Sequence, residues 1–297
     1  MDDLSPARIL RDVANSIPSE FHKLIVVVGS LAAGFHYFGN DEDREIRTKD
    51  IDCVVSPRVK AVAAGKEITE HLLKTGWEPR SHEGRTFPAL PETLDSELPG
   101  IRLNPPGHRG WFLEFLTVPD PDDKNNRQWM RVELESGHAG LASFRYLSLT
   151  DFEPLPTGYG IYYARPATMA LANLLSHQNI GLEVMSTKIG GREIKRSNKD
   201  LGRVLAMARL SDEELDSWPQ IWIDALKSRF PDQFDKLAPI VGDGLRALLA
   251  SENDLEQAAH TCNHGLLVDD VVKAGELGLT GLRFMQDVID VFEKMSS

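Results

Sequence analysis

The sequence has few cysteines and no long apolar run, and these absences exclude several classes of protein. Only two cysteines occur among the 297 residues, Cys53 and Cys262, which is too few for a disulfide-rich secreted scaffold and lacks metal-ligand spacing. The longest apolar stretch, Leu24 to Phe35, is interrupted by glycine and serine and is well short of the about 20 residues that cross a bilayer. The first residues, Met-Asp-Asp-Leu, lack the basic region and apolar core of a secretion signal. We therefore expect a cytoplasmic protein without membrane contact.

Positive charge is scarce overall and is gathered in one segment. The formal net charge is −12, which argues against indiscriminate binding of nucleic acids. Residues 188–210 nevertheless carry seven basic and two acidic side chains, whereas residues 211–297 carry seven basic and 17 acidic ones. A local basic segment therefore lies beside an acidic C-terminal region, and the local field matters more to an anionic ligand than the total charge.

The hydrophobic pattern changes near residue 165. Before it, the spacing predicts helices at 5–17, 30–38 and 57–74, and strands at 23–28, 50–56, 110–119, 143–149 and 160–164. Residues 79–109 contain six prolines and are predicted to be irregular. From Pro166 onward, helices are predicted at 167–178, 198–210, 212–229, 232–250, 254–275 and 281–295. We predict an α/β (α+β) fold with a mixed-sheet core, residues 1–165, followed by an all-helical domain, residues 166–297.

Two carboxylates occupy one face of a predicted strand. Side chains alternate along a strand, so Asp50 and Asp52 point the same way. Neighbouring carboxylates repel each other, and a divalent cation such as Mg²⁺ removes that penalty. Glu114, within the apolar strand FLEFL, supplies a third acid. Three carboxylates on adjoining strands can hold two metal ions about 4 Å apart, the arrangement used for phosphoryl displacement.

A Gly-Ser turn precedes these acids. Gly29 and Ser30 stand between an apolar strand and a predicted helix, where free backbone N–H groups and the helix dipole suit a phosphate. Taken singly, such a turn is an ordinary connection, and a lone strand acid often faces solvent. The ordered combination of the turn and the three acids favours a phosphate and metal site.

These residues resemble a known signature. Gly29-Ser30, the run RTKDID and the run FLEFL are similar to the nucleotidyltransferase signature of the DNA polymerase β superfamily. That resemblance implies an NTP triphosphate on the Gly-Ser turn and two Mg²⁺ ions, or Mn²⁺ in their place, on Asp50, Asp52 and Glu114. RTKDID, ARPATMALANLLSHQ and GREIKRSNKDLGRVL resemble, more closely, the AbiEii and MenT group of bacterial nucleotidyltransferase toxins. This implies transfer to the 3′ end of RNA or tRNA and an antitoxin protein as partner.

The sequence departs from that group in two places. Nineteen residues separate Ser30 from Asp50, which is longer than the usual gap. Where the toxins often have His-Lys on the first C-terminal helix, this chain has His177 and Gln178. If the toxins' lysine neutralises NTP phosphates, another cation must do so here.

The basic segment offers the replacement cations. Lys195, Arg196 and Lys199 are candidates for binding the triphosphate or an RNA backbone, and Lys195 and Lys199 would share a helical face. Asp200 is a candidate general base for the acceptor hydroxyl, or it orients a neighbouring cation. Gly190-Gly191 would let the segment close over a nucleotide. The alternative is a solvated helix face.

We thus predict an Mg²⁺-dependent nucleotidyltransferase that moves an NMP from an NTP to an acceptor hydroxyl. A basic track favours an RNA acceptor, whereas the acidic C-terminal region favours a cationic small molecule of the aminoglycoside type. A third hypothesis is an inactive regulatory protein that binds nucleotide without transferring it.

Overall fold

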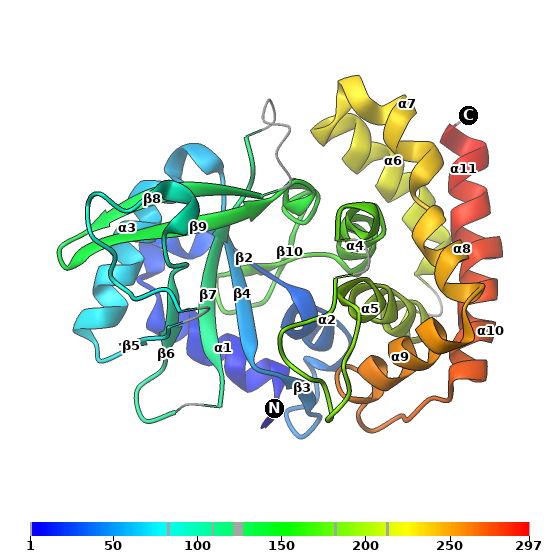
Figure 1. The fold of residues 1–297 in the computed structure, drawn as a ribbon, viewed down its shortest axis with the longest axis horizontal. Coiled ribbons are helices and arrows are strands. Elements are labelled where there is room, and N and C mark those ends of the chain that lie inside the picture. Colours follow the sequence, from blue (N-terminus) through cyan, green and yellow to red (C-terminus); the bar gives the residue numbers. More distant parts are fainter. Residues whose placement is uncertain are drawn as a thin grey trace. The chain divides into compact units, whose positions relative to one another are not determined.

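The computed structural model describes residues 2–81, 84–108, 110–120, 127–180, 183–211 and 214–296, without the side chains of Asp2 and of residues 178–180. The chain divides into two compact units, Met1–Ala164 and Arg165–Ser297. The first unit combines helices with a mixed sheet and the second is helical (Figure 1), so the predicted fold class is confirmed.

A mixed sheet is the centre of the first unit. Its strands are β2 (Ile25–Val28), β4 (Asp50–Val55), β5 (Glu78–Pro79), β6 (Arg102–Asn104), β7 (Phe112–Thr117), β8 (Arg127–Leu134), β9 (Gly137–Phe144), β10 (Leu155–Pro156) and β11 (Tyr162–Tyr163). The order is β10-β11-β2-β4-β7-β6-β5, and β9 pairs with both β7 and β8. Strand β4 is antiparallel to β2 and parallel to β7, so it lies inside the sheet. A separate two-stranded ladder joins β1 (Asp2–Leu4) to β3 (Ile46–Thr48).

The described α-helices of this unit are α1 (Pro6–Ser16), α2 (Gly29–Phe38) and α3 (Arg58–Lys74), and each lies where the apolar periodicity predicts a helix. A short 3₁₀ helix at Ser19–Leu24 was not predicted. Helix α1 begins with a proline at its first position, where a missing N–H group costs no hydrogen bond. Helix α3 ends before Gly76, whose φ of +92° suits glycine.

Helix α3 covers one face of the sheet. Leu116 pairs with Ala142 across β7 and β9, so Ala142 shares its face with Leu116 and with Glu114, two residues before it. Leu141 therefore points to the opposite face, where a Cβ atom on Gly65 of α3 would lie 3.1 Å from its Cδ1 atom. Figure 1 shows α3 alongside the β8–β9 hairpin. The face that carries Glu114 is thus the one turned away from α3.

The second unit is built from helices packed around aromatic side chains. Its described helices are α4 (Pro166–Ile180), α5 (Arg196–Leu210), α6 (Trp218–Arg229), α7 (Phe234–Leu237), α8 (Asp243–Leu249), α9 (Glu252–Asn263), α10 (Ala274–Phe284) and α11 (Asp290–Ser296). Trp218, Trp222, Phe284 and Phe292 are fully buried. Trp222 Nε1 donates a hydrogen bond of 2.8 Å to the carbonyl of Ala167, which joins α6 to α4. In the described residues, none of the helices combines the length and apolar content needed to cross a bilayer.

The structure corrects the sequence-based strands. Residues 143–149 are not a strand, since they contain the end of β9 and a 3₁₀ helix at Leu147–Leu149. Tyr146 and Leu149 are both buried, and a spacing of three is helical rather than extended. The true strands of this region, β8 and β9, were missed, as was β6 within the segment predicted to be irregular.

Two long helices predicted in the C-terminal half are broken. Residues 232–250 contain α7 and α8, separated by a stretch with Pro239 and Gly242. Residues 254–275 contain most of α9, a loop and the start of α10, and Asn263 holds that loop by hydrogen bonds of 2.8 Å to the N–H and C=O groups of Val272. Residues 212–213, at the start of another predicted helix, lie outside the described residues.

Each unit contains one cysteine. Cys53 lies in β4 of the first unit and Cys262 in α9 of the second, and both thiols are free and buried. Burial raises the pKa of both thiols, and at Cys53 the neighbouring Asp52 raises it further.

Candidate functional site

The two carboxylates of β4 lie on one face of the sheet, as the alternation predicts. Asp50 and Asp52 are both half-buried. Thr48 Oγ1 donates a hydrogen bond of 3.1 Å to Asp50 Oδ1. Asp52 is in register with Val28 at the end of β2 and with Glu114 of β7. Paired residues of neighbouring strands point to the same face, so three acids share one surface.

The Gly-Ser turn directly adjoins Asp52. Gly29 follows the last residue of β2 and has a φ of +77°, a backbone conformation that is unfavourable for residues other than glycine. A Cβ atom at this position would lie 3.1 Å from Asp52 Oδ2. Helix α2 begins at Gly29, and its N-cap residue, Val28, makes no side-chain cap hydrogen bond. The backbone N–H groups of that turn, Ser30 included, are therefore oriented as donors beside a carboxylate pair.

The third acid is held by an arginine that the sequence analysis missed. Arg102 of β6 is in register with Glu114, and its Nη2 atom donates a hydrogen bond of 2.8 Å to Glu114 Oε1. The two side chains are only 15% and 12% exposed. Burial raises the pKa of Glu114, and the adjacent Arg102 guanidinium offsets part of that rise. Glu114 therefore lies beside Asp52, but its carboxylate is paired with the Arg102 side chain.

The donor set fits a divalent cation only in part. Asp50 and Asp52 supply the carboxylate oxygens that Mg²⁺ prefers, and the absent side chain of Gly29 keeps the space beside Asp52 clear. Among the described residues, no three aspartate, glutamate, histidine or cysteine side chains are grouped so as to hold a metal ion. The β4 pair can hold a cation together with ligand phosphate oxygens, whereas Oε1 of Glu114 is already bound by Arg102.

The basic segment, residues 188–210, belongs to the second unit. Lys195 is not helical, since it is the residue before α5 and has extended backbone angles. The expectation that Lys195 and Lys199 share a helical face is therefore wrong. Lys195 Nζ lies 2.7 Å from Asp254 Oδ1, and Arg196 Nε lies 3.8 Å from Glu183 Oε2.

The side chains of Lys199 and Asp200 have no polar partner among the described residues. Lys199 and Asp200 are half-buried in the first turn and a half of α5. Neither side chain makes a hydrogen bond or an ion pair within the described part of the chain. The structure thus brings Gly29, Ser30, Asp50, Asp52 and Glu114 together in the first unit, and it does not relate Lys195, Arg196, Lys199 and Asp200 to them.

The Gly190-Gly191 turn is packed against a helix. The N–H and C=O groups of Ile189 and Arg192 exchange hydrogen bonds across the two glycines, whose φ angles are +51° and +82°. Gly190 lies against the rings of His260 and His264 in and after α9, and His260 Nε2 is 2.8 Å from the carbonyl oxygen of Ile189. This contact ties the turn to its own unit.

His177 packs inside the second unit. His177 of α4 packs against Gly244 of α8, and its Nδ1 atom is buried without a hydrogen-bond partner in the described residues. The side chain of Gln178 lies outside the described residues.

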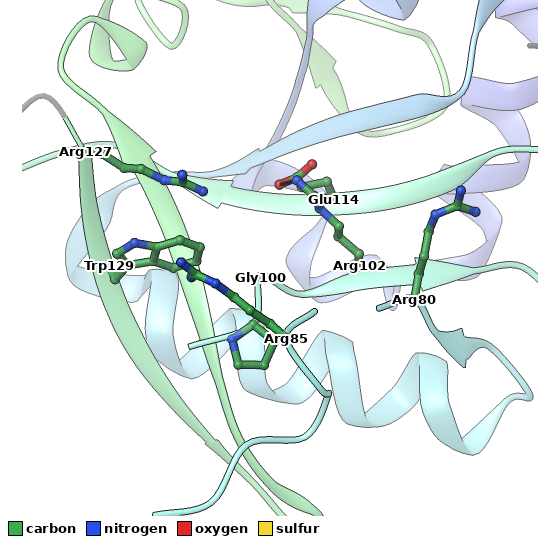
Figure 2. Close-up of a pocket in the computed structure, with 8 residues that line it drawn as sticks. Arg80, Arg85, Gly100, Arg102, Glu114, Arg127 and Trp129 are labelled. Carbon is green, nitrogen blue, oxygen red and sulfur yellow. Dashed lines mark hydrogen bonds and ion pairs between the residues drawn. The ribbon is translucent and has the colours of Figure 1, made fainter. Parts of the chain in front are cut away.

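Arginines surround Glu114 in a small pocket that sequence reasoning did not anticipate. The pocket is lined by Arg80, Arg85, Pro99, Gly100, Arg102, Glu114, Arg127 and Trp129. Figure 2 shows Arg102 extending to Glu114, with Arg127 and Trp129 coming from β8. A signal was present, because the run IRLN places Arg102 between apolar residues, as in a short strand.

Comparisons with known proteins return weak likenesses. No protein-family model and no curated protein matches the chain. An antigenic nucleotidyltransferase-like protein from Paracoccidioides brasiliensis shares 14% identity at a TM-score of 0.31, covering 80% of this chain and 94% of its own. A STING-associated CdnE c-di-GMP synthase from Capnocytophaga granulosa shares 12% identity at a TM-score of 0.23, covering 98% of this chain and 80% of its own. Similarity of this strength supports no inference about function.

Proposed function

We propose that the chain is a metal-dependent nucleotidyltransferase that moves an NMP from an NTP to an acceptor hydroxyl. The observation that carries this proposal is the placement of Asp50 and Asp52 on one face of β4, with Gly29 against Asp52 Oδ2. The two carboxylates can bind a cation, and the N–H groups at the start of α2, beside them, can bind the phosphates that share this cation.

Each group has a defined part in the transfer. The N–H groups of Gly29 and Ser30 would bind the triphosphate, and Asp50 and Asp52 would hold Mg²⁺, or Mn²⁺ in its place. The ions would neutralise phosphate charge and lower the pKa of the acceptor hydroxyl. A bond forms between the acceptor oxygen and the α-phosphorus as the bond from that phosphorus to the bridging oxygen breaks. Pyrophosphate leaves with the bonding electrons, and the hydroxyl proton passes to a base.

The second unit is proposed to serve the acceptor and the phosphates. The resemblance to toxin nucleotidyltransferases favours an RNA or tRNA 3′ end as acceptor, with an antitoxin protein as a partner. Lys195 and Arg196 pair with Asp254 and Glu183, and this favours Lys199 as the cation offered to a ligand. Asp200 beside it remains the candidate base for the hydroxyl proton.

A second function is favoured by the pairing of Glu114. With its third carboxylate neutralised by Arg102, the site could bind a nucleotide and transfer nothing. Such a protein would act as a nucleotide-responsive regulator. Binding and transfer therefore have to be measured separately.

Incubation with each α-labelled NTP, Mg²⁺ or Mn²⁺ and bulk tRNA tests the proposal. We expect label on RNA with the wild type, loss of labelling in Asp52→Asn, and retention in Asp12→Asn, which neutralises an exposed carboxylate of α1. Label only on an added aminoglycoside would identify the small-molecule acceptor. NTP binding in calorimetry without any labelling would identify the regulator, and absence of NTP binding would overturn both functions.

A further inference from the structure

The pocket beside Glu114 concentrates positive charge on the face of the sheet that carries the acids. Its charged side chains are Arg80, Arg85, Arg102, Arg127 and Glu114. The four guanidinium groups outnumber Glu114 together with Asp50 and Asp52 of the same face, so the local charge is positive in a chain whose formal net charge is −12. Such a positive charge attracts anions and disfavours a cationic ligand at this point.

Aromatic rings hold the guanidinium groups in place. Arg80 lies over the ring of Phe112, 4.5 Å from its centroid. Arg127 and Arg85 lie over the ring of Trp129, at 4.6 Å and 5.3 Å from its centroid. A guanidinium that stacks on a ring keeps its N–H donors in its own plane, available for a planar or tetrahedral anion. The pocket therefore presents donors whose orientation is fixed before a ligand arrives.

Hydrogen bonding within the pocket leaves a donor unused. Arg80 Nη1 donates to Asn104 Oδ1 at 3.0 Å, and Arg85 Nη1 donates to the carbonyl of Leu98 at 2.8 Å. Arg102 is bound to Glu114 through Nη2, but its Nε atom is buried and has no acceptor among the described residues. A buried donor of a charged group without an acceptor is costly, so a site that retains one is suited to an incoming oxygen.

The strand order places this pocket on the far side of the acids from the Gly-Ser turn. Strand β2, which leads into Gly29, neighbours β4; β7 comes next, and β6 with Arg102 follows. With about 4.8 Å between strands, the carboxylates lie between two phosphate-attracting positions. In an in-line displacement the attacking oxygen approaches opposite the leaving pyrophosphate. A triphosphate on the turn therefore leaves the arginine pocket to the acceptor.

We propose that the arginine pocket binds a phosphate group of the acceptor, and that the acceptor is a phosphate ester such as a nucleotide or an RNA strand. The assignment to the acceptor rests on the proposed function, whereas the anion site itself does not. A free nucleotide and an RNA strand share this chemistry, so the test has to distinguish them.

Binding measured without NTP or metal tests the site independently of transfer. Calorimetric titrations would use inorganic phosphate, AMP and a short single-stranded oligoribonucleotide against the wild type, Arg80→Gln, Arg85→Gln, Arg80→Lys and Lys60→Gln. Lys60 is an exposed cation of α3, so its variant loses the same charge on the covered side of the sheet. Matching thermal unfolding midpoints would show that the variants are folded.

The expected result is a loss of affinity for all three probes of about tenfold or more in Arg80→Gln and Arg85→Gln, an intermediate loss in Arg80→Lys, and no change in Lys60→Gln. Much tighter binding of the oligoribonucleotide than of AMP identifies an RNA strand, and equal binding identifies a free nucleotide. If the arginine variants match Lys60→Gln, the pocket is not an anion site. If they lose binding but retain labelling of RNA, the acceptor assignment fails while the proposed function stands.

Discussion

At the scale of single residues, Gly29 meets two requirements that a side chain would violate. Its φ is +77°, and a Cβ atom would lie 3.1 Å from Asp52 Oδ2. We expect Gly29→Ala to lower the free energy of unfolding by about 1–2 kcal/mol through backbone strain. It should also weaken the binding of Mg²⁺ with NTP, because the added methyl group crowds the carboxylate. Urea unfolding and calorimetry would measure the two effects.

Gly158 is a matched control for this substitution. Its φ is +83°, and a Cβ atom there would meet nothing within 4 Å. Gly158→Ala should cost a similar free energy of unfolding and leave nucleotide binding unchanged. Equal nucleotide affinities in the two variants would contradict the placement of the phosphates at the Gly29-Ser30 turn.

His177 should make the second unit sensitive to acid. Burial lowers the pKa of His177, although Asp243 and Asp254 oppose that shift. The unfolded chain therefore takes up a proton at higher pH than the folded unit does. The stability that the neutral His177 contributes is fully present above the unfolded pKa of about 6.5. It is lost as the pH falls toward the lowered pKa of the folded unit.

We expect His177→Gln to flatten the decline in unfolding free energy between about pH 7 and about pH 5. Urea unfolding across this range would measure the difference between wild type and variant. His71→Gln, at an exposed position of α3, serves as the control. Parallel pH curves for wild type and His177→Gln would show that the buried ring does not control the acid response.

At the scale of elements, the Gly190-Gly191 turn separates backbone strain from packing. Both residues have positive φ, but only Gly190 lies against the His260 and His264 rings, and a Cβ on Gly191 would meet nothing within 4 Å. Gly191→Ala should therefore cost about 1–2 kcal/mol of unfolding free energy. Gly190→Ala should cost about 1–3 kcal/mol more, because the rings must move. Thermal unfolding of both variants would measure this, and equal losses would refute the packing of the turn on α9.

The sequence predicted the elements whose periodicity is strong. Alternation was enough to place Asp50 and Asp52 on one face, and apolar spacing located α1, α2 and α3 closely. Strand β6 escaped because its three residues, two of them polar, lie among six prolines. The role of Arg102 depends on its pairing with Glu114 on the neighbouring strand. The two residues are 12 positions apart, so no local sequence pattern predicts the pairing. The extended backbone of Lys195 likewise follows from the loop before α5.

At the scale of the whole molecule, the two units differ in what they offer a ligand. The first unit contains the carboxylates, the Gly-Ser turn and the arginine pocket on one sheet face. The second contains Lys199 and Asp200 on a helix. A ligand that binds the first unit stabilises that unit by mass action, and a unit that binds nothing gains nothing unless the two unfold together.

The distribution of the two thiols makes this coupling measurable. A buried thiol with a raised pKa reacts with an alkylating reagent only when its surroundings open, so Cys53 reports on the first unit and Cys262 on the second. Pulsed alkylation in urea, read by peptide mass spectrometry, should show NTP with Mg²⁺ slowing the modification of Cys53. If Cys262 is slowed by the same factor, the units open as one cooperative block. If it is unaffected, each melts independently. Each unit thus has a natural thiol whose alkylation rate reports its local opening, without an engineered probe.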